Sequence, residues 1–371
     1  MRVSIDASPL LLRSAGVKNY LYHWIRHLRM NSSGHALSTF PFLDNVGSLT
    51  HESSVLSLWQ TIPRLGVLLL SNVRGNPALS WMNKGTDIFH ATNQIHNLVH
   101  GVRLTATLHD MTCWLMPELH TQANVIADKR FADKVLHRAA GLIAVSENTR
   151  QDALRILNLK PEKVVTIHSG IPDSFFDVTM SAAGEVAGRY GLDKPYILSV
   201  GTVEPRKNLD ALLDAYLLLP TELRREHDLV LAGPMGWAAN STSQRIRSGL
   251  PGVKYLGYVP ENDLPAITKG ARVFAYPSLY EGFGFPVAQA MACGVPVVTS
   301  STSCLPEISG GGALHVDPKS PSEISHAIAR VLESADLRDT LSKTGLQIAE
   351  ARYRWEVCAK KSWDFFASAA G

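Results

Sequence analysis

The chain has 371 residues, more than one hydrophobic core usually organises, so we expect two domains of ordinary size. Its 45% hydrophobic and 19% charged residues are typical of a soluble globular enzyme-like protein and exclude a disordered or coiled-coil chain. The formal net charge of +3 is too small to indicate a nucleic-acid partner.

Short β-rich runs alternate with helical patterns along most of the chain, which predicts an α/β protein with parallel sheets covered by helices. The first half has predicted strands at 3–5, 86–90, 104–108, 141–145 and 163–167. A second series follows at 196–200, 228–232, 253–256, 273–276 and 295–299. We therefore predict two sheets, one in each half.

The first half is basic. Residues 1–100 contain eight Lys and Arg against four Asp and Glu. Contact with an anionic membrane surface or an anionic substrate fits this surplus, as does an ordinary solvated face. The apolar run 65–70 is too short to span a bilayer, and the N-terminus lacks the features of a signal peptide. We expect a cytoplasmic protein, with peripheral contact at the inner face of the membrane as an open alternative.

Two positions in the first half follow predicted strands, where open α/β sheets bind ligands. Gly16 comes after the first strand and would let a ligand approach the backbone, although a single glycine is more often only a turn. His109 ends the strand 104–108, and the adjacent Asp110 would either fix the imidazole or cap the next segment.

The connection between the halves is predicted from Ser169-Gly170-Ile171-Pro172 and a helical pattern at 182–190. The predicted domains are 1–178 and 179–352. The last segment, 353–371, is predicted to be an amphipathic helix packed on a domain, because its bulky aromatic residues lie roughly on one face.

A basic loop follows the first strand of the second half. It runs from Gly201 to Asn208 and contains Arg206 and Lys207, and Asn208 is expected to be the N-cap of the next helix. Adjacent Arg and Lys at the carboxyl end of a strand would neutralise most of the charge of a diphosphate. A solvated basic loop is the alternative, and the sequence favours the diphosphate by roughly two to one.

The most informative loop is Glu281-Gly282-Phe283-Gly284-Phe285-Pro286, between a predicted strand and a predicted helix. Close glycines allow backbone approach, and Pro286 suits the first turn of a helix, whose free N–H groups favour a diphosphate. Glu281 would then accept hydrogen bonds from sugar hydroxyls. An ordinary turn with a solvated Glu fits this stretch alone equally well.

Other sequence patterns argue against a metal site, disulfide bonds and a dinucleotide cofactor. The cysteines at 113, 293, 304 and 358 have no metal-ligand or paired spacing, which predicts free buried thiols in a reducing compartment. A dinucleotide fingerprint, an HExxH pattern and a DxD pattern are all missing from the sequence. We therefore expect no metal and no resident cofactor, neither an NAD enzyme nor a metal-dependent sugar transferase.

Taken together, these segments resemble the retaining, GT-B-fold glycosyltransferases of family four, the glycosyl transferases group 1. The resemblance covers nearly the whole chain, including 86–92, 107–110, 144–149, 201–208 and 281–298. It implies two Rossmann-like domains facing a central cleft, with the terminal helix crossing back to the first domain. It also implies that the second domain binds a nucleotide diphosphate sugar.

The resemblance assigns a role to each candidate residue. Arg206 and Lys207 would contact the diphosphate, Glu281 the donor sugar, and Gly16 and His109 that sugar from the first domain. The other residues of the implied donor site would bind the phosphates, the base and the ribose; they are Gly201, Tyr258, Val259, Gly284, Phe285 and Gln289.

Two positions depart from the family pattern. Gln289 replaces a second Glu that holds the ribose hydroxyls, so nucleotide affinity or base preference would differ. Lys18 replaces a glycine in the first loop and would either reach phosphates or an acidic acceptor, or point to solvent.

The function that follows from the resemblance is metal-independent, retaining transfer of a hexosyl unit to a glycan or lipid-linked glycan acceptor, with a modest preference for mannosyl. One alternative is a nucleotide-sugar-binding protein without transfer activity. Another is a sugar-nucleotide epimerase or glycan phosphorylase on the same fold.

Overall fold

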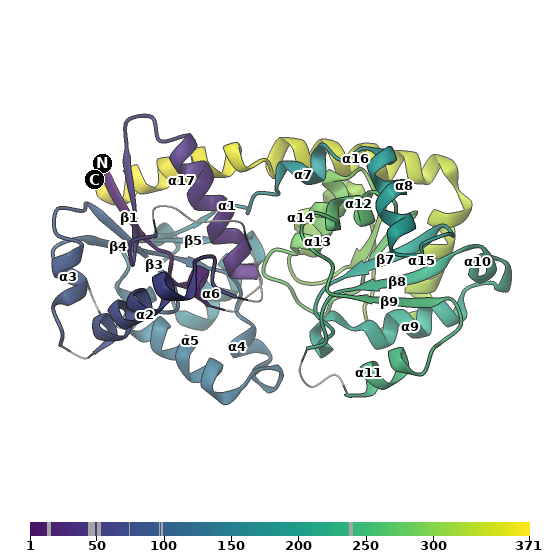
Figure 1. Cartoon of the computed structure of the whole chain (residues 1–371), viewed down its shortest axis with the longest axis horizontal. Coiled ribbons are helices and arrows are strands. Elements are labelled where there is room, and N and C mark those ends of the chain that lie inside the picture. The colour runs from purple at the N-terminus through teal and green to yellow at the C-terminus, as the bar shows by residue number, and fades with distance from the viewer. Residues whose placement is uncertain are drawn as a thin grey trace. The chain divides into compact units, whose positions relative to one another are not determined.

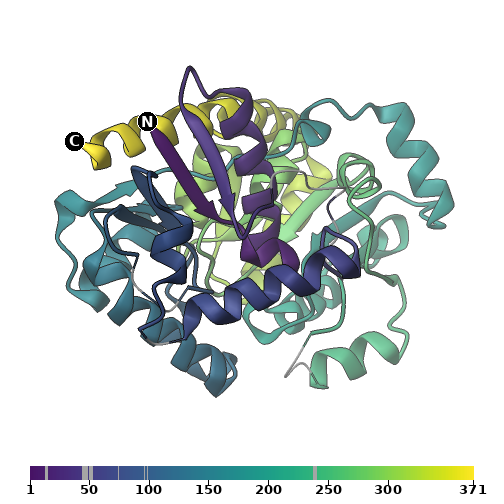
Figure 2. The same ribbon diagram turned by 60° about the vertical axis from the view of Figure 1, so that its left-hand side comes forward.

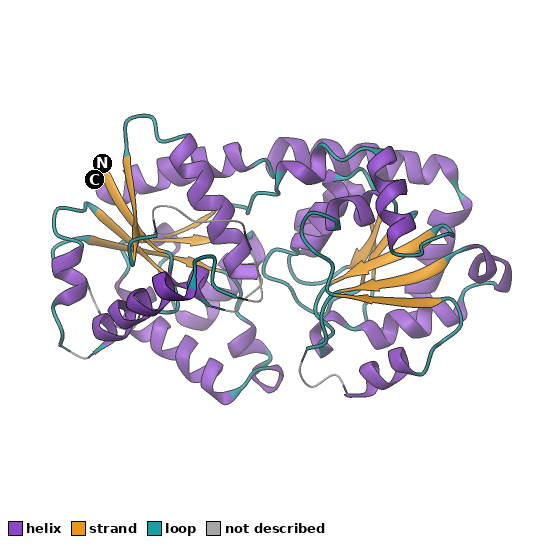
Figure 3. Cartoon of the chain, viewed as in Figure 1, coloured by secondary structure: helices purple, strands orange, loops and turns teal. Residues whose placement is uncertain are grey.

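The computed structural model describes residues 1–12, 16–43, 49, 53–73, 75–95, 97, 99–236 and 240–371. Within them the chain forms two compact units, Met1–Gly170 with Trp355–Gly371 and then Ile171–Arg354 (Figure 1). Both are α/β units with a parallel sheet between helices (Figure 3), which confirms the predicted fold class.

The first unit contains a six-stranded parallel sheet in the order β2-β1-β3-β4-β5-β6. Its central strands are buried over nearly their whole length, as expected of strands covered on both faces. The strands are β1 (Arg2–Asp6), β2 (Ala36–Phe40), β3 (Ile88–Ala91), β4 (Arg103–Leu108), β5 (Gly141–Ala144) and β6 (Val164–Thr166).

Helices cover this sheet, and the last one comes from the C-terminal end of the chain. They are α1 (Gly16–Met30), α2 (Leu58–Asn72), α3 (Ala78–Met82), α4 (Thr112–Leu115), α5 (Gln122–Lys134), α6 (Glu147–Leu157) and α17 (Trp355–Ala370). Helix α17 lies along α1 (Figure 2), where the indole N–H of Trp24 donates to Ser362 Oγ at 2.9 Å. The 3-10 turn η1 (Ser8–Leu11) follows β1.

The second unit has its own six-stranded parallel sheet, in the order β12-β11-β10-β7-β8-β9. Its strands are β7 (Tyr196–Val200), β8 (Asp228–Ala232), β9 (Val253–Gly257), β10 (Val273–Tyr276), β11 (Val297–Ser300) and β12 (Ala313–Val316). Its helices are α7 (Asp173–Phe176), α8 (Met180–Arg189), α9 (Leu209–Leu218), α10 (Thr221–Glu226), α11 (Asn240–Arg247), α12 (Leu264–Lys269), α13 (Phe285–Ala292), α14 (Leu305–Ser309), α15 (Pro321–Glu333) and α16 (Ala335–Arg352).

The divide between the units falls after Gly170, earlier in the chain than the predicted boundary after residue 178. The reason is local packing: α7 contacts α12 and α13, and the backbone N–H of Ile171 donates to the carbonyl of Tyr353 at 2.7 Å. Residues 171–178 and 353–354 therefore belong to the second unit.

The strand order reverses once in each sheet. In the first unit the reversal lies between β1 and β3, and in the second between β7 and β10. Loops that leave two such strands diverge and open a crevice at the carboxyl edge, where ligands of doubly wound sheets bind. The Gly201–Asn208 loop follows β7 and the Glu281 loop follows β10, so both lie at this position.

Candidate functional site

The Glu281 loop joins β10 to α13. Gly284 is the N-cap of α13 with φ = 79°, and Pro286 occupies the first turn as predicted. A Cβ on Gly284 would also lie 2.8 Å from a methyl group of Leu305. Only glycine meets both requirements without strain, so this loop can bring the backbone N–H groups of Gly284 and Phe285 at the start of α13 close to an anion.

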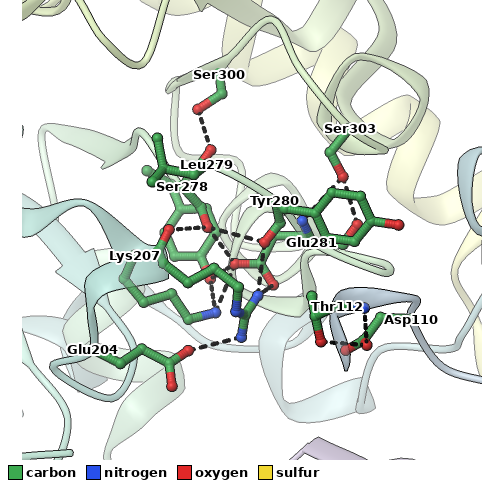
Figure 4. A network of polar contacts seen from close by, with 12 residues as sticks. Asp110, Thr112, Glu204, Lys207, Ser278, Leu279, Tyr280, Glu281, Ser300 and Ser303 are labelled. Atoms are coloured by element: carbon green, nitrogen blue, oxygen red, sulfur yellow. Dashed lines mark hydrogen bonds and ion pairs between the residues drawn. The ribbon is translucent and has the colours of Figure 1, made fainter. Parts of the chain in front are cut away.

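Four side chains converge on the Glu281 carboxylate (Figure 4). Oε1 accepts hydrogen bonds from Lys207 Nζ at 2.7 Å, the Tyr276 hydroxyl at 2.9 Å and Ser278 Oγ at 2.6 Å. Oε2 lies 2.7 Å from a guanidinium nitrogen of Arg206. The carboxylate is therefore fixed in position by groups from the end of β10 and from the loops after β7 and β10.

The electrostatics of this cluster keep Glu281 ionised. Burial raises the pKa of its carboxyl group, but the charges of Arg206 and Lys207 outweigh burial and hold that pKa at about 2. Burial lowers the pKa of Lys207, and the negative charge of Glu281 opposes this shift. Burial also raises the pKa of Tyr276 well above its usual value, so its hydroxyl stays a hydrogen-bond donor.

Arg206 has further partners. Its guanidinium donates to Glu204 Oε1 at 2.8 Å and to the carbonyl oxygen of Tyr280 at 2.7 Å. The cluster thus contains two cations and two anions, and its formal charge is zero. The sequence assigned Arg206 and Lys207 to a diphosphate and Glu281 to a sugar, whereas the structure places all three in one ion-pair network.

Asn208 is the N-cap residue of α9, as predicted, and its side chain links neighbouring loops at this edge of the sheet. It occupies the N-cap position in the left-handed region, with φ = 57°, and forms no side-chain cap. Its amide instead donates to the carbonyl oxygens of Pro277 at 3.0 Å and Pro318 at 2.6 Å. The bond to Pro277 joins the loop after β7 to the loop after β10 and so fixes the two halves of the cluster relative to each other, and the bond to Pro318 reaches the segment after β12.

The predicted base and ribose residues lie at the same edge of the second sheet. Gly201 directly follows β7, and a Cβ there would be 3.6 Å from Lys207 Cε. Tyr258 and Val259 directly follow β9; the Tyr258 side chain is 39% exposed and that of Val259 is buried. Because parallel strands end at a common edge, these residues share it with Glu281.

Helix α13 carries the remaining predicted contacts. Phe285 is its first residue, and the Phe285 ring packs edge-on against Phe283 at 5.0 Å between centroids. Gln289 follows one turn later and is half-buried. Its substitution for Glu leaves α13 without a carboxylate, because the residues of this helix are all uncharged.

In the first unit, Gly16 begins α1 and is exposed, with open space around the position of a Cβ. The residues just before it, 13–15, lie outside the described residues. His109 follows β4 and packs edge-on against the Tyr20 ring at 5.0 Å. Loss of hydration lowers the pKa of His109 to about 4 although Asp110 opposes this, so the imidazole is neutral at pH 7.

Two sequence alternatives in the first unit are now resolved. Asp110 caps the next segment, because its Oδ1 accepts from the backbone N–H of Thr112 at 2.9 Å and from its hydroxyl at 2.6 Å. Lys18 neither reaches for a ligand nor points to solvent. It is fully buried, and its Nζ donates to the carbonyl oxygens of Leu12 at 2.9 Å and Ser53 at 2.5 Å.

Sequence reasoning missed several polar residues at the switch points. In the second unit these are Glu204, Tyr276 and Ser278. Glu204 lies inside the basic loop, so its place in the sequence could have identified it as a site residue. In the first unit, the buried carboxylate of Asp6 accepts hydrogen bonds from the hydroxyl of Thr92 and the backbone N–H of Ser8. Burial raises the pKa of Asp6.

Comparisons with known families cover both units. Residues 14–175 match the family described as Glycosyltransferase Family 4, and residues 188–347 match Glycosyl transferases group 1. Each match spans one of the two Rossmann-like units and ends near the divide between them.

Individual proteins agree with these matches. The chain is 35% identical to the O-antigen chain mannosyltransferase B of Escherichia coli over 74% of this chain and 72% of that protein. Its fold is similar to sucrose-phosphate synthase from Thermosynechococcus elongatus, with a TM-score of 0.75, 19% identity and coverage of 99% and 98% of the two chains. It is also similar to HepE of Anabaena in complex with UDP-glucose, with a TM-score of 0.73, 17% identity and coverage of 99% of each chain. The chain is therefore a glycosyltransferase with the GT-B fold, and it belongs to glycosyltransferase family 4, the glycosyl transferases group 1.

Proposed function

We propose that this glycosyltransferase moves a mannosyl unit from a nucleotide diphosphate sugar to a glycan or lipid-linked glycan acceptor, with retention at the anomeric carbon and without a metal ion. Two comparisons support the substrates: the similar E. coli protein is named an O-antigen chain mannosyltransferase, and the structure of HepE contains UDP-glucose. The transfer itself is supported most by the charged cluster around Glu281.

The cluster offers the right charges for loss of a diphosphate. As the bond to the leaving group breaks, negative charge grows on its oxygens, and Lys207, Arg206 and the N–H groups at the start of α13 would stabilise it. Positive charge grows on the anomeric carbon, which a fixed, ionised Glu281 stabilises. The leaving phosphate would take the proton of the acceptor hydroxyl.

Two partly buried cations, Arg206 and Lys207, would also supply to a diphosphate part of the positive charge that a divalent ion supplies elsewhere, which supports metal independence. The presence of Gln289 in place of Glu favours a second candidate, a nucleotide-sugar-binding protein without turnover. An amide lacks the negative charge with which a carboxylate binds the ribose hydroxyls. The epimerase and phosphorylase alternatives remain distinguishable by their products.

A turnover assay tests the proposal. The purified chain is incubated with radiolabelled GDP-mannose, UDP-glucose and other donors, each with and without a glycan acceptor and EDTA. We expect transfer that needs an acceptor and survives EDTA, with retained anomeric configuration by NMR. Lys207→Met should abolish it, whereas the matched control Lys254→Met should not, because Lys254 pairs with Asp228 at the amino end of the sheet.

Three other outcomes would refute the proposal. Donor binding without product would favour the binding protein. Product without an added acceptor would favour the epimerase, and dependence on inorganic phosphate would favour the phosphorylase.

A further inference from the structure

The segment after β11 holds the backbone of the Glu281 loop through the side chain of Ser303. The Ser303 hydroxyl donates to the carbonyl oxygen of Glu281 at 2.6 Å and accepts from the backbone N–H of Glu281 at 3.0 Å (Figure 4). One hydroxyl thus satisfies both backbone groups of the residue whose carboxylate lies at the centre of the charged cluster. We call this pair of hydrogen bonds the Ser303 clamp.

The backbone of Ser303 adopts a conformation that serine normally avoids. Its φ is 59°, in the left-handed region, where a side chain beyond Cα causes strain. Glycine would adopt this φ without strain, but glycine has no hydroxyl to form the clamp. Strained residues that persist next to a site often serve it, so the serine is a second sign that the hydroxyl has a function here.

The Ser303 clamp differs from the bonds that hold the Glu281 side chain. Those bonds include the ion pairs with Lys207 and Arg206, the two cations to which a diphosphate would bind. A bound donor would weaken these ion pairs, since its diphosphate and the carboxylate compete for the same charges. The clamp joins backbone atoms to a neutral hydroxyl, for which an anion has no such charge attraction.

We propose that Ser303 is a positioning residue, which keeps Glu281 in place after the donor diphosphate has bound the two cations of the cluster. This inference rests on the proposed transfer reaction. Ser303 acts through Glu281 and need not touch the donor. A displaced carboxylate stabilises the developing positive charge less well than one in place, so loss of the clamp should lower kcat and leave donor binding unchanged.

Two substitutions separate the effect of the hydroxyl from that of the strain. Ser303→Ala and Ser303→Gly both remove the clamp, but only glycine also relieves the strained φ. The donor is GDP-mannose or UDP-glucose, whichever the wild type turns over. We expect kcat to fall roughly tenfold in both variants, while the donor KM stays unchanged. In thermal unfolding, Ser303→Gly should be the more stable of the two.

A double-mutant cycle checks that the effect passes through the Glu281 carboxylate. In the Glu281→Gln background, Ser303→Ala should lower kcat by less than about twofold, because the group that the clamp positions is already lost. The matched control is Thr302→Ala, which removes a neighbouring hydroxyl of the same segment. Thr302 is exposed, and its hydroxyl donates to the carbonyl oxygen of Leu279 at 3.3 Å. This control should keep the wild-type kcat.

Three results would overturn the inference. One is a wild-type kcat in both Ser303 variants. Another is a kcat that follows stability, with Ser303→Gly close to the wild type, since the serine would then only support the fold. The third is the full effect of Ser303→Ala in the Glu281→Gln background, which would mean that Ser303 acts on another group. A wild type that transfers no sugar would refute the proposed function together with this inference, whereas the three results above leave the proposed function standing.

Discussion

Glu281 is held by more groups than a contact to a sugar requires. Lys207, Arg206, Tyr276 and Ser278 all bind its carboxylate, so a bound donor must share or displace some of these bonds. A diphosphate would compete with Glu281 and Glu204 for the same two cations. Part of its attraction to Lys207 and Arg206 is therefore offset by the ion pairs already present.

Glu281→Gln tests this competition by its separate effects on nucleotide affinity and on turnover. The amide keeps the size of the side chain but raises the formal charge of the cluster from zero to +1. We expect turnover to fall by about two to three orders of magnitude, while affinity for the free nucleoside diphosphate is unchanged or higher. Initial rates and calorimetric titrations of the same preparations measure both. Wild-type turnover in this variant would remove Glu281 from the donor sugar.

The low pKa of Glu281 also predicts how stability depends on pH. A carboxyl group with a pKa of 4.5 when unfolded and about 2 when folded stabilises the native state above pH 4.5, and this contribution disappears as the pH falls towards 2. It amounts to something on the order of 3 kcal/mol. In urea unfolding, the stability advantage of wild type over Glu281→Gln should shrink between pH 4.5 and 2. A difference that stays constant across this range would contradict the assigned cause.

At the scale of elements, the fully buried strands were the clearest in the sequence, although the edge strands β6 and β9 were predicted as well. Central strands such as β3, β5, β10 and β11 are buried at every residue and therefore form apolar runs. The two strands that were not predicted, β2 and β12, form one edge of each sheet and mix exposed with buried positions. The short polar pattern of an edge strand differs little from that of a loop.

The sequence predicted which residues lie at the candidate site but not which of them contact one another. Lys207 and Glu281 each stand after a predicted strand, which pointed to the carboxyl edge. Their contact depends on β10 pairing with β7, although β8 and β9 intervene in the chain. A single sequence does not specify that strand order, so neither the ion pairs nor the role of Asn208 followed from it.

The starts of α1 and α13 offer a comparison between two glycines. A Cβ on Gly16 meets open space, so Gly16→Ala should leave the free energy of unfolding unchanged or raise it by up to about 1 kcal/mol. If a ligand approaches this backbone, donor turnover should nevertheless fall. Gly284→Ala should cost at least about 1–2 kcal/mol, because alanine is strained at positive φ and would also clash with Leu305. Full activity of a stable Gly16→Ala would show that no ligand comes close there.

At the scale of the whole molecule, the chain passes between the units twice, after Gly170 and after Arg354. Helix α17 returns to complete the first core: the Phe366 ring packs against Trp24 and His90, and Phe365 lies where any side chain at Gly141 would clash with it. Each unit thus has its own sheet and core, which is the condition for separate unfolding.

We therefore predict two calorimetric transitions, one for each unit. Phe366→Leu should lower the first unit's stability by about 1 kcal/mol and identify its transition. A nucleoside diphosphate at a hundred times its dissociation constant should stabilise only the second unit, by about 2.7 kcal/mol, because the charged cluster lies wholly in that unit.

The intact donor sugar adds a further test, since Gly16 and His109 belong to the first unit. If these residues contact the sugar as predicted, the donor should raise both transitions where the nucleotide raises one. If the nucleotide instead shifted the transition identified by Phe366→Leu, the nucleotide would bind to the first unit, which contradicts the prediction.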